Sequence, residues 1–539
     1  MKQYTISDFS KLRQQPTQDF REAMETVLAK LPDQPYGISD RSNLYESETA
    51  YNHHRTRKLK PILASCFVLL FVMGLFIMRH GKQDIILSNS QAPDGKETIP
   101  QSTAEFIPVT NDLPEESLST STLDRIDLYV DPELLWNSET GILAEGDNII
   151  KASGLPYKNA VYRAMSEQGK SAEGEIVYQS ANQGIVFRQQ MTLRLGGDYY
   201  SMDMPQKSLQ IEAKDGSFNY PLFEDRPDAA YASILLRNSG NDCLYTRVAD
   251  VVQNRLIEKF LDTDLLTLAW CPVTVYLNGE YWGIYNMREN PDAYTVCRHE
   301  GLEAKEADSI TILRLNGSAI QGDGTEYRQM LSALRTMNPA NPPSGLEYLE
   351  QLIDIDSYLD WLAVKIYFGD TDAASTFMCY RVPGGKWKCL AQDFDYGLFR
   401  ADYDAVSDAL KESGMGTANS DNIVSRKILE VDGYRTRFIE KIGTLYQAIT
   451  SEAMQRELDT CVSMIEPEMK NHLERWSPYN ESTINSDAPT DPSKAWQYWE
   501  QRLDRMRNGT MAHRPGYVYQ QVQRYFGLTD QEMKTYFGE

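Results

Sequence analysis

Hydrophobic and polar positions alternate along several stretches of the first half of the main body. GIVFRQQMTLRL (184–195) and KSLQIEAK (207–214) place apolar residues at every second position, which is the period of a strand with one buried face. CPVTVYLNGEYWGIYNMRE (271–289) contains two such runs joined by Asn278 and Gly279. These two residue types adopt the positive φ angles of a type I′ turn, so the pattern predicts a β-hairpin.

Helical spacing replaces the alternation further along the chain. Apolar residues recur every three to four positions at 250–270, 327–337, 357–369, 434–449 and 451–476, and this period predicts amphipathic helices. Strand-like patterns dominate from 123 to about 320, and helical patterns dominate after it. A β-rich half followed by a helical half predicts an α+β fold with two lobes, and ligands commonly bind between such lobes.

The segment PILASCFVLLFVMGLFIM, residues 61–78, contains no charged residue and shows no polar face. A buried core helix would show a polar face, whereas a helix of about 27 Å is long enough to cross a thin bilayer, so we expect a transmembrane helix. The segment begins too far into the chain for a cleaved secretory signal, which predicts an uncleaved anchor. Arg55, Arg57, Lys58 and Lys60 precede it and favour a cytoplasmic N-terminus with the C-terminal domain outside the cytoplasm.

The predicted membrane helix divides the chain into four regions. Residues 1–60 form a cytoplasmic tail in which DFREAMETVLAKLP predicts one short amphipathic helix, a candidate docking element for a cytoplasmic partner. Residues 79–122 are polar and rich in Ser, Thr and Pro, which predicts a flexible stalk. Residues 123–539 then form one large domain.

Composition and missing motifs exclude several classes of protein. The net charge is −23, and an acidic surface repels phosphate backbones, which argues against nucleic-acid binding. The chain contains no GxSxG, HExxH or Walker motif, and its histidines have no metal-ligand spacing. The cysteines of the main body form no CxxC pair and favour buried free thiols, with one disulfide left open as an alternative: Cys243, Cys271, Cys297, Cys379, Cys389 and Cys461.

Five charged residues within apolar stretches are candidates for chemistry. Asp393 and Asp395 lie two positions apart in LAQDFDYGLF; on one face of a strand their charges repel unless a cation or a proton lies between them. A phosphoryl-transfer site also needs a lysine for phosphate oxygens, a carboxylate that holds it and a proton-accepting aspartate. Lys207, Glu289 and Asp372 supply these types in that chain order. Each alone also has an ordinary explanation: an edge-strand charge, a surface ion pair and a helix-end turn.

Several motifs resemble the CotH kinase family, the spore coat protein H-like atypical kinases, and in particular its membrane-anchored bacterial members. The most specific are ILLRNSGNDC (234–243), VYLNGEYWGIYNMRE (275–289) and GGKWKCLAQDFDYGLF (384–399), together with IDIDSYLDWLAVKIYFGDTD (353–372). The resemblance extends from about 123 to 480. It implies an atypical protein-kinase-like bilobal fold and metal-dependent transfer of phosphate from ATP to Ser or Thr of proteins.

The resemblance also implies a role for each candidate residue. Asp393 and Asp395 are expected to bind Mg or Mn, and Asp372 to act as the catalytic acid/base. Lys207 and Glu289 are expected to bind the ATP cofactor, Lys207 through its phosphates.

Ser375 and Thr376 replace an Asn that the family has shortly after the catalytic Asp. ATP is also scarce outside the cytoplasm. A weakly active or inactive surface module that binds protein or glycan is therefore a second hypothesis.

Overall fold

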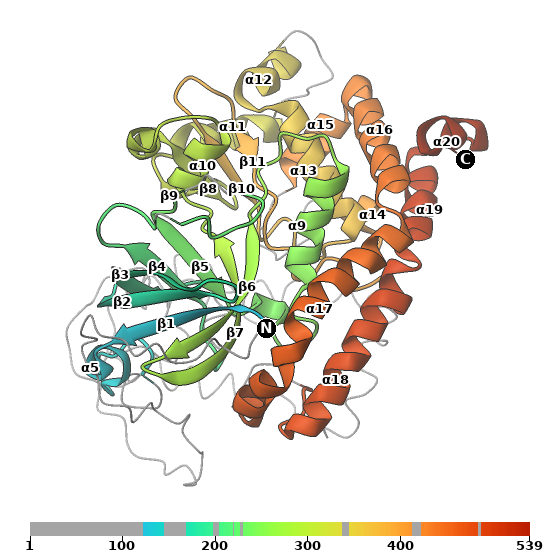
Figure 1. Cartoon of the computed structure of the whole chain (residues 1–539). Coiled ribbons are helices and arrows are strands. Elements are labelled where there is room, and N and C mark those ends of the chain that lie inside the picture. Colours follow the sequence, from blue (N-terminus) through green and yellow to red (C-terminus); the bar gives the residue numbers. More distant parts are fainter. Residues whose placement is uncertain are drawn as a thin grey trace, which may run out of the picture. The chain divides into compact units, whose positions relative to one another are not determined.

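The computed structural model describes residues 122–144, 169–197, 204–218, 220–226, 230–336, 344–411, 422–482 and 487–538 (Figure 1). The predicted tail helix, the membrane helix at 61–78 and the stalk as far as residue 121 lie outside these residues. Among the described residues no helix combines the length and the apolar composition needed to cross a membrane.

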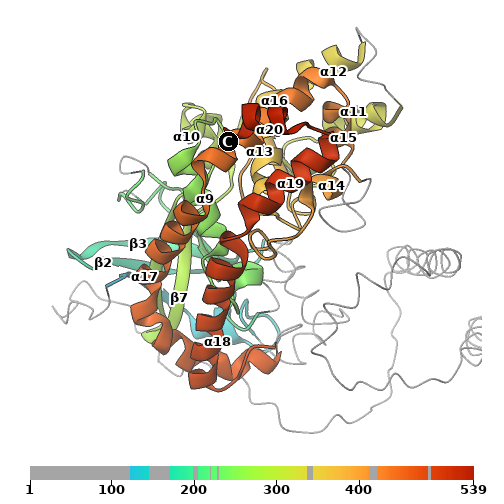
Figure 2. The same ribbon diagram turned by 90° about the vertical axis from the view of Figure 1, so that its right-hand side faces the viewer.

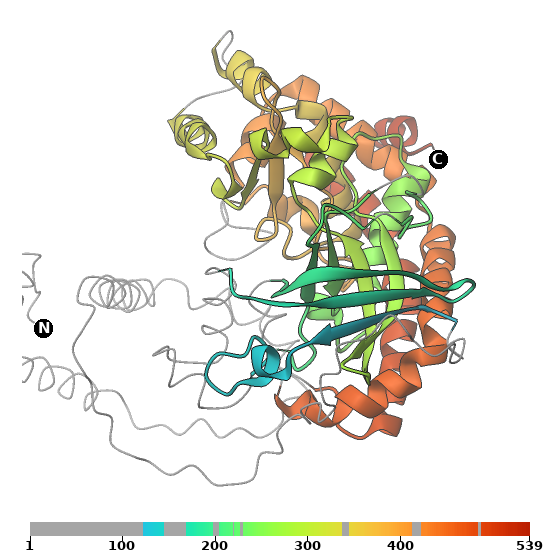
Figure 3. The same cartoon turned by 60° about the vertical axis from the view of Figure 1, so that its left-hand side comes forward.

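The first half of the domain is a closed β-barrel with strand order β1-β2-β3-β4-β5-β7-β6. Neighbouring strands pair antiparallel except β1 and β6, whose parallel pairing closes the barrel. The long strands β1, β2 and β3 lie side by side in Figure 3. The strand bounds are Asp124–Val130 (β1), Ser171–Ser180 (β2), Gly184–Leu195 (β3), Leu209–Ala213 (β4), Ser233–Arg237 (β5), Trp270–Leu277 (β6) and Glu280–Glu289 (β7).

Alternating residues of these strands fill the barrel. Met191, Leu193 and Leu195 of β3 are buried in one cluster with Leu209 and Ile211 of β4. The intervening residues of β3 are more exposed, which is the period of two that the sequence shows. The predicted strand at 184–195 is therefore confirmed, and the one predicted at 207–214 is confirmed over Leu209–Ala213.

The turn between β6 and β7 is the one predicted from Asn278 and Gly279, whose φ angles are 51° and 85°. The Asn278 side chain also accepts from the Val130 N–H at 2.9 Å and donates to the Val130 carbonyl at 2.8 Å. The turn residue thus ties the hairpin to the end of β1, which reinforces the parallel closure of the barrel.

The second half contains a smaller sheet, with strand order β11-β10-β8-β9, and most of the helices. Its strands are Thr311–Arg314 (β8), Ser318–Gln321 (β9), Met378–Arg381 (β10) and Lys388–Cys389 (β11). The helices are Pro132–Trp136 (α5), Ala249–Phe260 (α9), Ala293–His299 (α10), Thr325–Thr336 (α11), Ser344–Leu352 (α12), Ile355–Phe368 (α13), Ala405–Ala409 (α14), Ile423–Leu429 (α15), Asp432–Ala448 (α16), Ser451–Trp476 (α17), Pro492–Asp504 (α18), Arg514–Phe526 (α19) and Asp530–Phe537 (α20).

Helix α17 joins the two halves. It packs against α9, α18 and strand β7, and Figure 2 shows it crossing the barrel strands beside α18. Its last residue, Trp476, donates from the indole to the Trp282 carbonyl at 2.8 Å. Gly283 has φ 110°, and a Cβ there would lie 2.8 Å from the Trp476 indole. A glycine is therefore required where the helix meets the strand.

The mixed α and β composition predicted from the pattern is confirmed, and the kinase-like bilobal arrangement stays a prediction. Helix α17 has the predicted bounds 451–476. The helix predicted at 250–270 is wrong beyond Phe260, because Leu261 is extended and Leu266 then forms a β-bridge with Leu390. All six cysteines of the main body are free thiols, as predicted.

Candidate functional site

The site forms where the end of β5 meets the loops after α13 and β11. Strand β5 contributes Arg237, the loop after α13 contributes Asp372, and the loop after β11, which we call the aspartate loop, contributes Asp393 and Asp395. We call these four residues the aspartate site. Helix α13 leads directly into the loop that carries Asp372. Asp354 caps its N-terminus, and Gly369 ends it with φ 66°. The left-handed residue turns the chain so that the aspartates at 370 and 372 follow at once.

Arg237 binds both aspartates of the third loop. Its Nη1 donates to Asp395 Oδ1 at 2.8 Å, and its Nη2 donates to Asp393 Oδ1 at 2.8 Å and to Asp395 Oδ2 at 2.9 Å. The Asp395 side chain is 2% exposed and the Asp393 side chain 33%. One guanidinium thus partly neutralises two carboxylates, one buried and one that solvent reaches.

Gly240 has no side chain, and this leaves room for the contacts between Arg237 and Asp395. It has φ 53°, and a Cβ would lie 2.2 Å from Asp395 Oδ2 and 2.7 Å from Arg237 Nη2. The next residue, Asn241, donates its N–H to Asp395 Oδ2 at 2.7 Å. The end of β5 and the loop after it therefore hold Asp395, through the Arg237 side chain and the Asn241 backbone.

Asp393 and Asp395 do not lie in a strand, which corrects the expectation that strand geometry brings them to one face. Strand β11 ends at Cys389, and Asp393 has φ 55°. Helix α9 holds the loop instead. Asp250 Oδ1 accepts from the Phe394 N–H at 3.0 Å, and Gln253 Nε2 donates to the Phe394 carbonyl at 2.9 Å.

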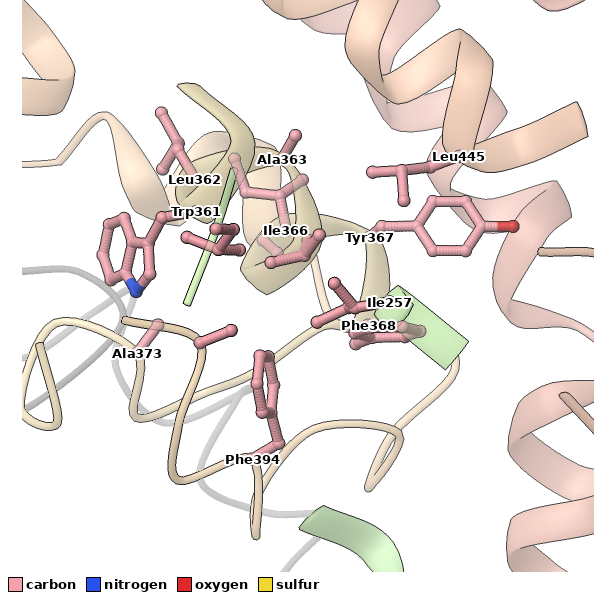
Figure 4. Close-up of a cluster of buried hydrophobic side chains, with 14 of the residues drawn as sticks. Ile257, Trp361, Leu362, Ala363, Ile366, Tyr367, Phe368, Ala373, Phe394 and Leu445 are labelled. Carbon is pink, nitrogen blue, oxygen red and sulfur yellow. The ribbon is translucent and has the colours of Figure 1, made fainter. Parts of the chain in front are cut away.

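A buried ion pair supports the loop that carries Asp393 and Asp395. Lys365 and Asp370 are both fully buried, and Lys365 Nζ lies 2.7 Å from Asp370 Oδ2. Lys365 also donates to the carbonyls of Gln392 and Asp393 at 2.8 and 3.0 Å. Its ammonium lies 3.8 Å from the centre of the Phe394 ring, which packs beneath α13 in Figure 4. The pair thus connects α13 to the aspartate loop.

Asp372 is less buried than Asp370. The Asp370 carboxylate accepts the Asp372 N–H at 2.9 Å, so it is occupied by Lys365 and by backbone. The pKa of Asp372 is raised to about 6, mainly by burial and also by the charges of Asp370 and Asp395, against a hydrogen bond from Ser375 and the charge of Lys365. A carboxylate with a pKa near neutrality is suited to general-base catalysis.

The pKa of Asp395 is also raised. Burial is the largest cause, Arg237 opposes it, and the charge of Asp393 adds to it. Burial raises the pKa of Asp393 too, against the effect of Arg237. A second positive charge at this pair would therefore be stabilising.

Lys207 does not lie on a strand, although the sequence predicted one that begins with it. It precedes β4 by two residues, is 4% exposed, and its Nζ donates to the Met204 carbonyl at 2.6 Å. Its neighbours Gln206 and Ser208 bind Asn238, which follows Arg237. The segment that carries Lys207 is thus packed against the residue that follows Arg237.

Glu289 is not brought to Lys207. The register aligns Glu289 with Ile234 and Ile211, four residues from Lys207, or about 13 Å along the strands. The buried Glu289 carboxylate accepts from Arg298 and, at 2.9 Å, from the Ala269 N–H. Its position on the opposite end of the strands explains why the predicted lysine–carboxylate arrangement is absent here.

The family model for CotH kinase protein matches residues 193–510. The chain belongs to the CotH kinase family. No curated protein matches the chain. The matched range contains every residue of the aspartate site and Lys207, whereas β1 and β2 precede it. CotH membership implies a kinase-like protein that uses ATP and a divalent metal.

The residues of this CotH domain fit a divalent cation. Hard cations prefer carboxylate oxygens, and three oxygens of Asp393 and Asp395 lie close enough together to bind one guanidinium. In the described residues another group, Asp264, His299 and Glu300, also has metal-like spacing. There Lys388 Nζ lies 2.6 Å from Asp264 and 2.9 Å from Glu300, so a basic side chain contacts the carboxylates of this group, as Arg237 does at Asp393 and Asp395.

Sequence reasoning missed four residues that build the site: Arg237, Asp250, Lys365 and Asp370. Asp370 stands two positions before Asp372 in FGDTD, and Lys365 is the one charge in the apolar run LAVKIYF. A lone lysine in an apolar helix needs a buried partner, and that signal points to a nearby acid. The roles of Arg237 and Asp250 depend on contacts across about 150 positions and have no local signal.

Proposed function

We propose that this CotH family protein is a Ser/Thr protein kinase that transfers phosphate from ATP in a reaction dependent on Mg or Mn. The observation that supports it best is the convergence of Asp393 and Asp395 on one guanidinium, beside an aspartate whose pKa is raised to about 6. Oxygen ligands and a poised base are the parts that phosphoryl transfer requires.

Asp372 is proposed to accept the proton of the acceptor hydroxyl. As the hydroxyl oxygen bonds to the γ-phosphorus, the bond from that phosphorus to the bridging oxygen breaks and ADP leaves. Asp393 and Asp395 are the proposed ligands of the cation, which when bound supplies charge neutralisation for the phosphate oxygens. Lys207 is proposed to contact phosphate after its ammonium leaves the Met204 carbonyl.

The test is transfer of labelled phosphate to a protein acceptor by the full chain with Mg or Mn. Asp393→Asn keeps the shape of the side chain and removes one charge, and we expect transfer to fall at least a thousandfold. Asp356→Asn is the matched control, because Asp356 lies on α13 with a 61% exposed side chain. Transfer that survives in Asp393→Asn contradicts the assignment of this residue.

A binding module without catalysis is the second candidate. It is favoured by Arg237, which already contacts both carboxylates, and by Ser375 and Thr376 at the position of the family Asn. Thermal unfolding with and without MgATP separates the two functions, because a ligand that binds only the folded state raises the melting temperature. A kinase gains stability with MgATP and loses that gain in Asp393→Asn.

We also propose that residues 61–78 anchor the protein in a membrane as a single-pass helix, with the kinase domain outside the cytoplasm. The support is a run without charges that is preceded by four basic residues. Protease added to intact cells digests the domain in this orientation and leaves it intact in the reverse one. Recovery in the soluble fraction after lysis contradicts the anchor.

A further inference from the structure

A cavity of about 560 Å³ lies at the far end of α9 from the aspartate site. Asp250, at the start of this helix, supports the aspartate loop, whereas Arg255, Glu258 and Lys259 line the cavity. Eight residues of helix, about 12 Å, separate Asp250 from Glu258. A volume of this size is typical of small-molecule sites.

Three arginines from different elements face this space, which we call the arginine cavity: Arg226 before β5, Arg255 on α9 and Arg298 on α10. Arg226 Nη2 donates to Glu258 at 2.9 Å, and Arg298 Nη2 binds the buried Glu289. Arg255 Nε donates to Glu457 at 2.5 Å. Ion pairs thus hold each guanidinium in place at the cavity wall.

Donors exceed acceptors in the arginine cavity. Within the described residues Arg298 uses only Nη2 for hydrogen bonds, and a guanidinium has five N–H groups and no acceptor. Both oxygens of Glu289 are already bonded, one to Arg298 and one to the Ala269 N–H. A ligand that satisfies the remaining donors must therefore bring acceptor oxygens.

We infer that the arginine cavity binds a phosphomonoester. Its three terminal oxygens and its charge of nearly −2 match donors that converge from three elements. Three arginines and one lysine line the cavity against three carboxylates, those of Asp225, Glu258 and Glu289. The lining therefore has a small excess of positive charge, although the chain as a whole carries −23. Inorganic phosphate and a phosphorylated side chain share this chemistry, and the cavity has room for the larger of the two.

The cavity is connected to the aspartate loop by hydrogen bonds. Leu266 lines the cavity, and its carbonyl accepts from the Ala391 N–H at 2.8 Å, two residues before Asp393. Helix α9 makes the second connection through Asp250 and Phe394. We expect an occupied cavity to change the rate of phosphate transfer, and this regulatory part rests on the proposed kinase function.

Calorimetric titration of the full chain with O-phosphoserine, inorganic phosphate and L-serine tests the site. We expect both phosphates to bind and L-serine not to bind, with the ratio of the two affinities identifying the source. Arg226→Gln should weaken binding at least tenfold, whereas Arg507→Gln should not. Arg507 is matched to Arg226 in exposure, with side chains 31% and 32% exposed, and each arginine is ion-paired to a carboxylate.

Arg298→Gln alone leaves Glu289 buried without its cation, so the double variant Arg298→Gln/Glu289→Gln keeps the charge balanced. It too should weaken binding tenfold. Binding that is absent, or unchanged in both the Arg226 and the Arg298 variants, overturns the site. The Asp393→Asn variant should bind O-phosphoserine with unchanged affinity. That result would exclude the aspartate site as the place where O-phosphoserine binds.

The coupling is measured separately as phosphate transfer with and without saturating O-phosphoserine. A change of at least threefold that is absent in Arg226→Gln supports it, and an unchanged rate in the unmodified protein overturns it. If no transfer is detected at all, the kinase proposal fails, while the titration still decides whether the cavity binds a phosphomonoester.

Discussion

The aspartate site and the arginine cavity lie at opposite ends of α9 and have opposite imbalances of charge. At the aspartate site one arginine faces two carboxylates, whereas at the cavity Arg226, Arg255 and Arg298 keep unused donors around bonded carboxylates. The first arrangement favours an added cation and the second an added anion. One helix thus presents two sites with complementary ligand preferences.

Removing the buried cation beneath the aspartate site should have the largest effect. Lys365→Met leaves Asp370 buried without its partner, and breaking such a pair costs about 3–5 kcal/mol. Urea unfolding measures the loss. The double variant Lys365→Met/Asp370→Leu should recover most of it, because the unpaired charge is gone. Equal losses in the single and double variants would show that the pair itself contributes little.

Filling the space beside Asp395 should have the second largest effect. Gly240→Ala places a Cβ 2.2 Å from Asp395 Oδ2 at a positive φ, and overpacking of this kind costs about 1–3 kcal/mol. The melting temperature and the transfer rate should both fall. Gly433→Ala is the control, since nothing lies within 4 Å of its Cβ, and it should leave both unchanged or raise stability slightly.

The pH dependence of transfer tests the role of Asp372. Its pKa is raised from 3.8 to about 6, so the carboxylate is protonated below that pH and cannot accept a proton. Transfer should rise about tenfold per pH unit below pH 6 and level off above it. A rate that stays constant from pH 5 to 7 contradicts the assignment.

The contribution of Asp372 to the free energy of unfolding should show the opposite dependence on pH. The folded state binds the Asp372 proton more tightly than the unfolded state, so the stabilising contribution is present below pH 4 and is lost as pH rises through 6. Asp372→Asn should remove this dependence in unfolding experiments.

The smallest effect is expected at the wall of the cavity. Arg226→Gln removes an ion pair with Glu258, in which the two side chains are 32% and 21% exposed, and a longer one with Glu289 at 3.9 Å, which Arg298 also binds. Such pairs contribute about 0.2–1 kcal/mol and are screened by salt. Unfolding at low and high salt measures the difference. A loss above 2 kcal/mol would mean that Arg226 supports the fold and is not mainly a ligand group.

Local patterns in the sequence identified the elements whose structure depends on neighbouring residues. Asn278 and Gly279 specify their turn by backbone preference, and the spacing of 451–476 specifies α17. The motif around Asp393 and Asp395 also pointed to the pair of carboxylates that Arg237 binds. Strand geometry was the wrong reason, because the two carboxylates converge through a loop held by α9 and Arg237.

The rest depends on contacts between distant parts of the chain. Glu289 lies at the end of the strand as expected, but its partners come from Arg298 and Ala269, and only the register shows its distance from Lys207. The helix predicted past Phe260 ends because Leu266 bonds to the aspartate loop. Helical spacing alone cannot reveal a competing partner that lies more than 100 residues away.

The closure of the barrel by β1 has a mechanical consequence. β1 is the first strand of the described chain, and it pairs with β2 on one side and β6 on the other. Tension that reaches the domain from residues 1–121 is therefore applied first to this strand and loads the bonds to both neighbours. Its rupture would leave β2 and β6 as open edges with unpaired backbone groups. A pull from the N-terminal side thus opens the barrel before it reaches the loops that carry the aspartates.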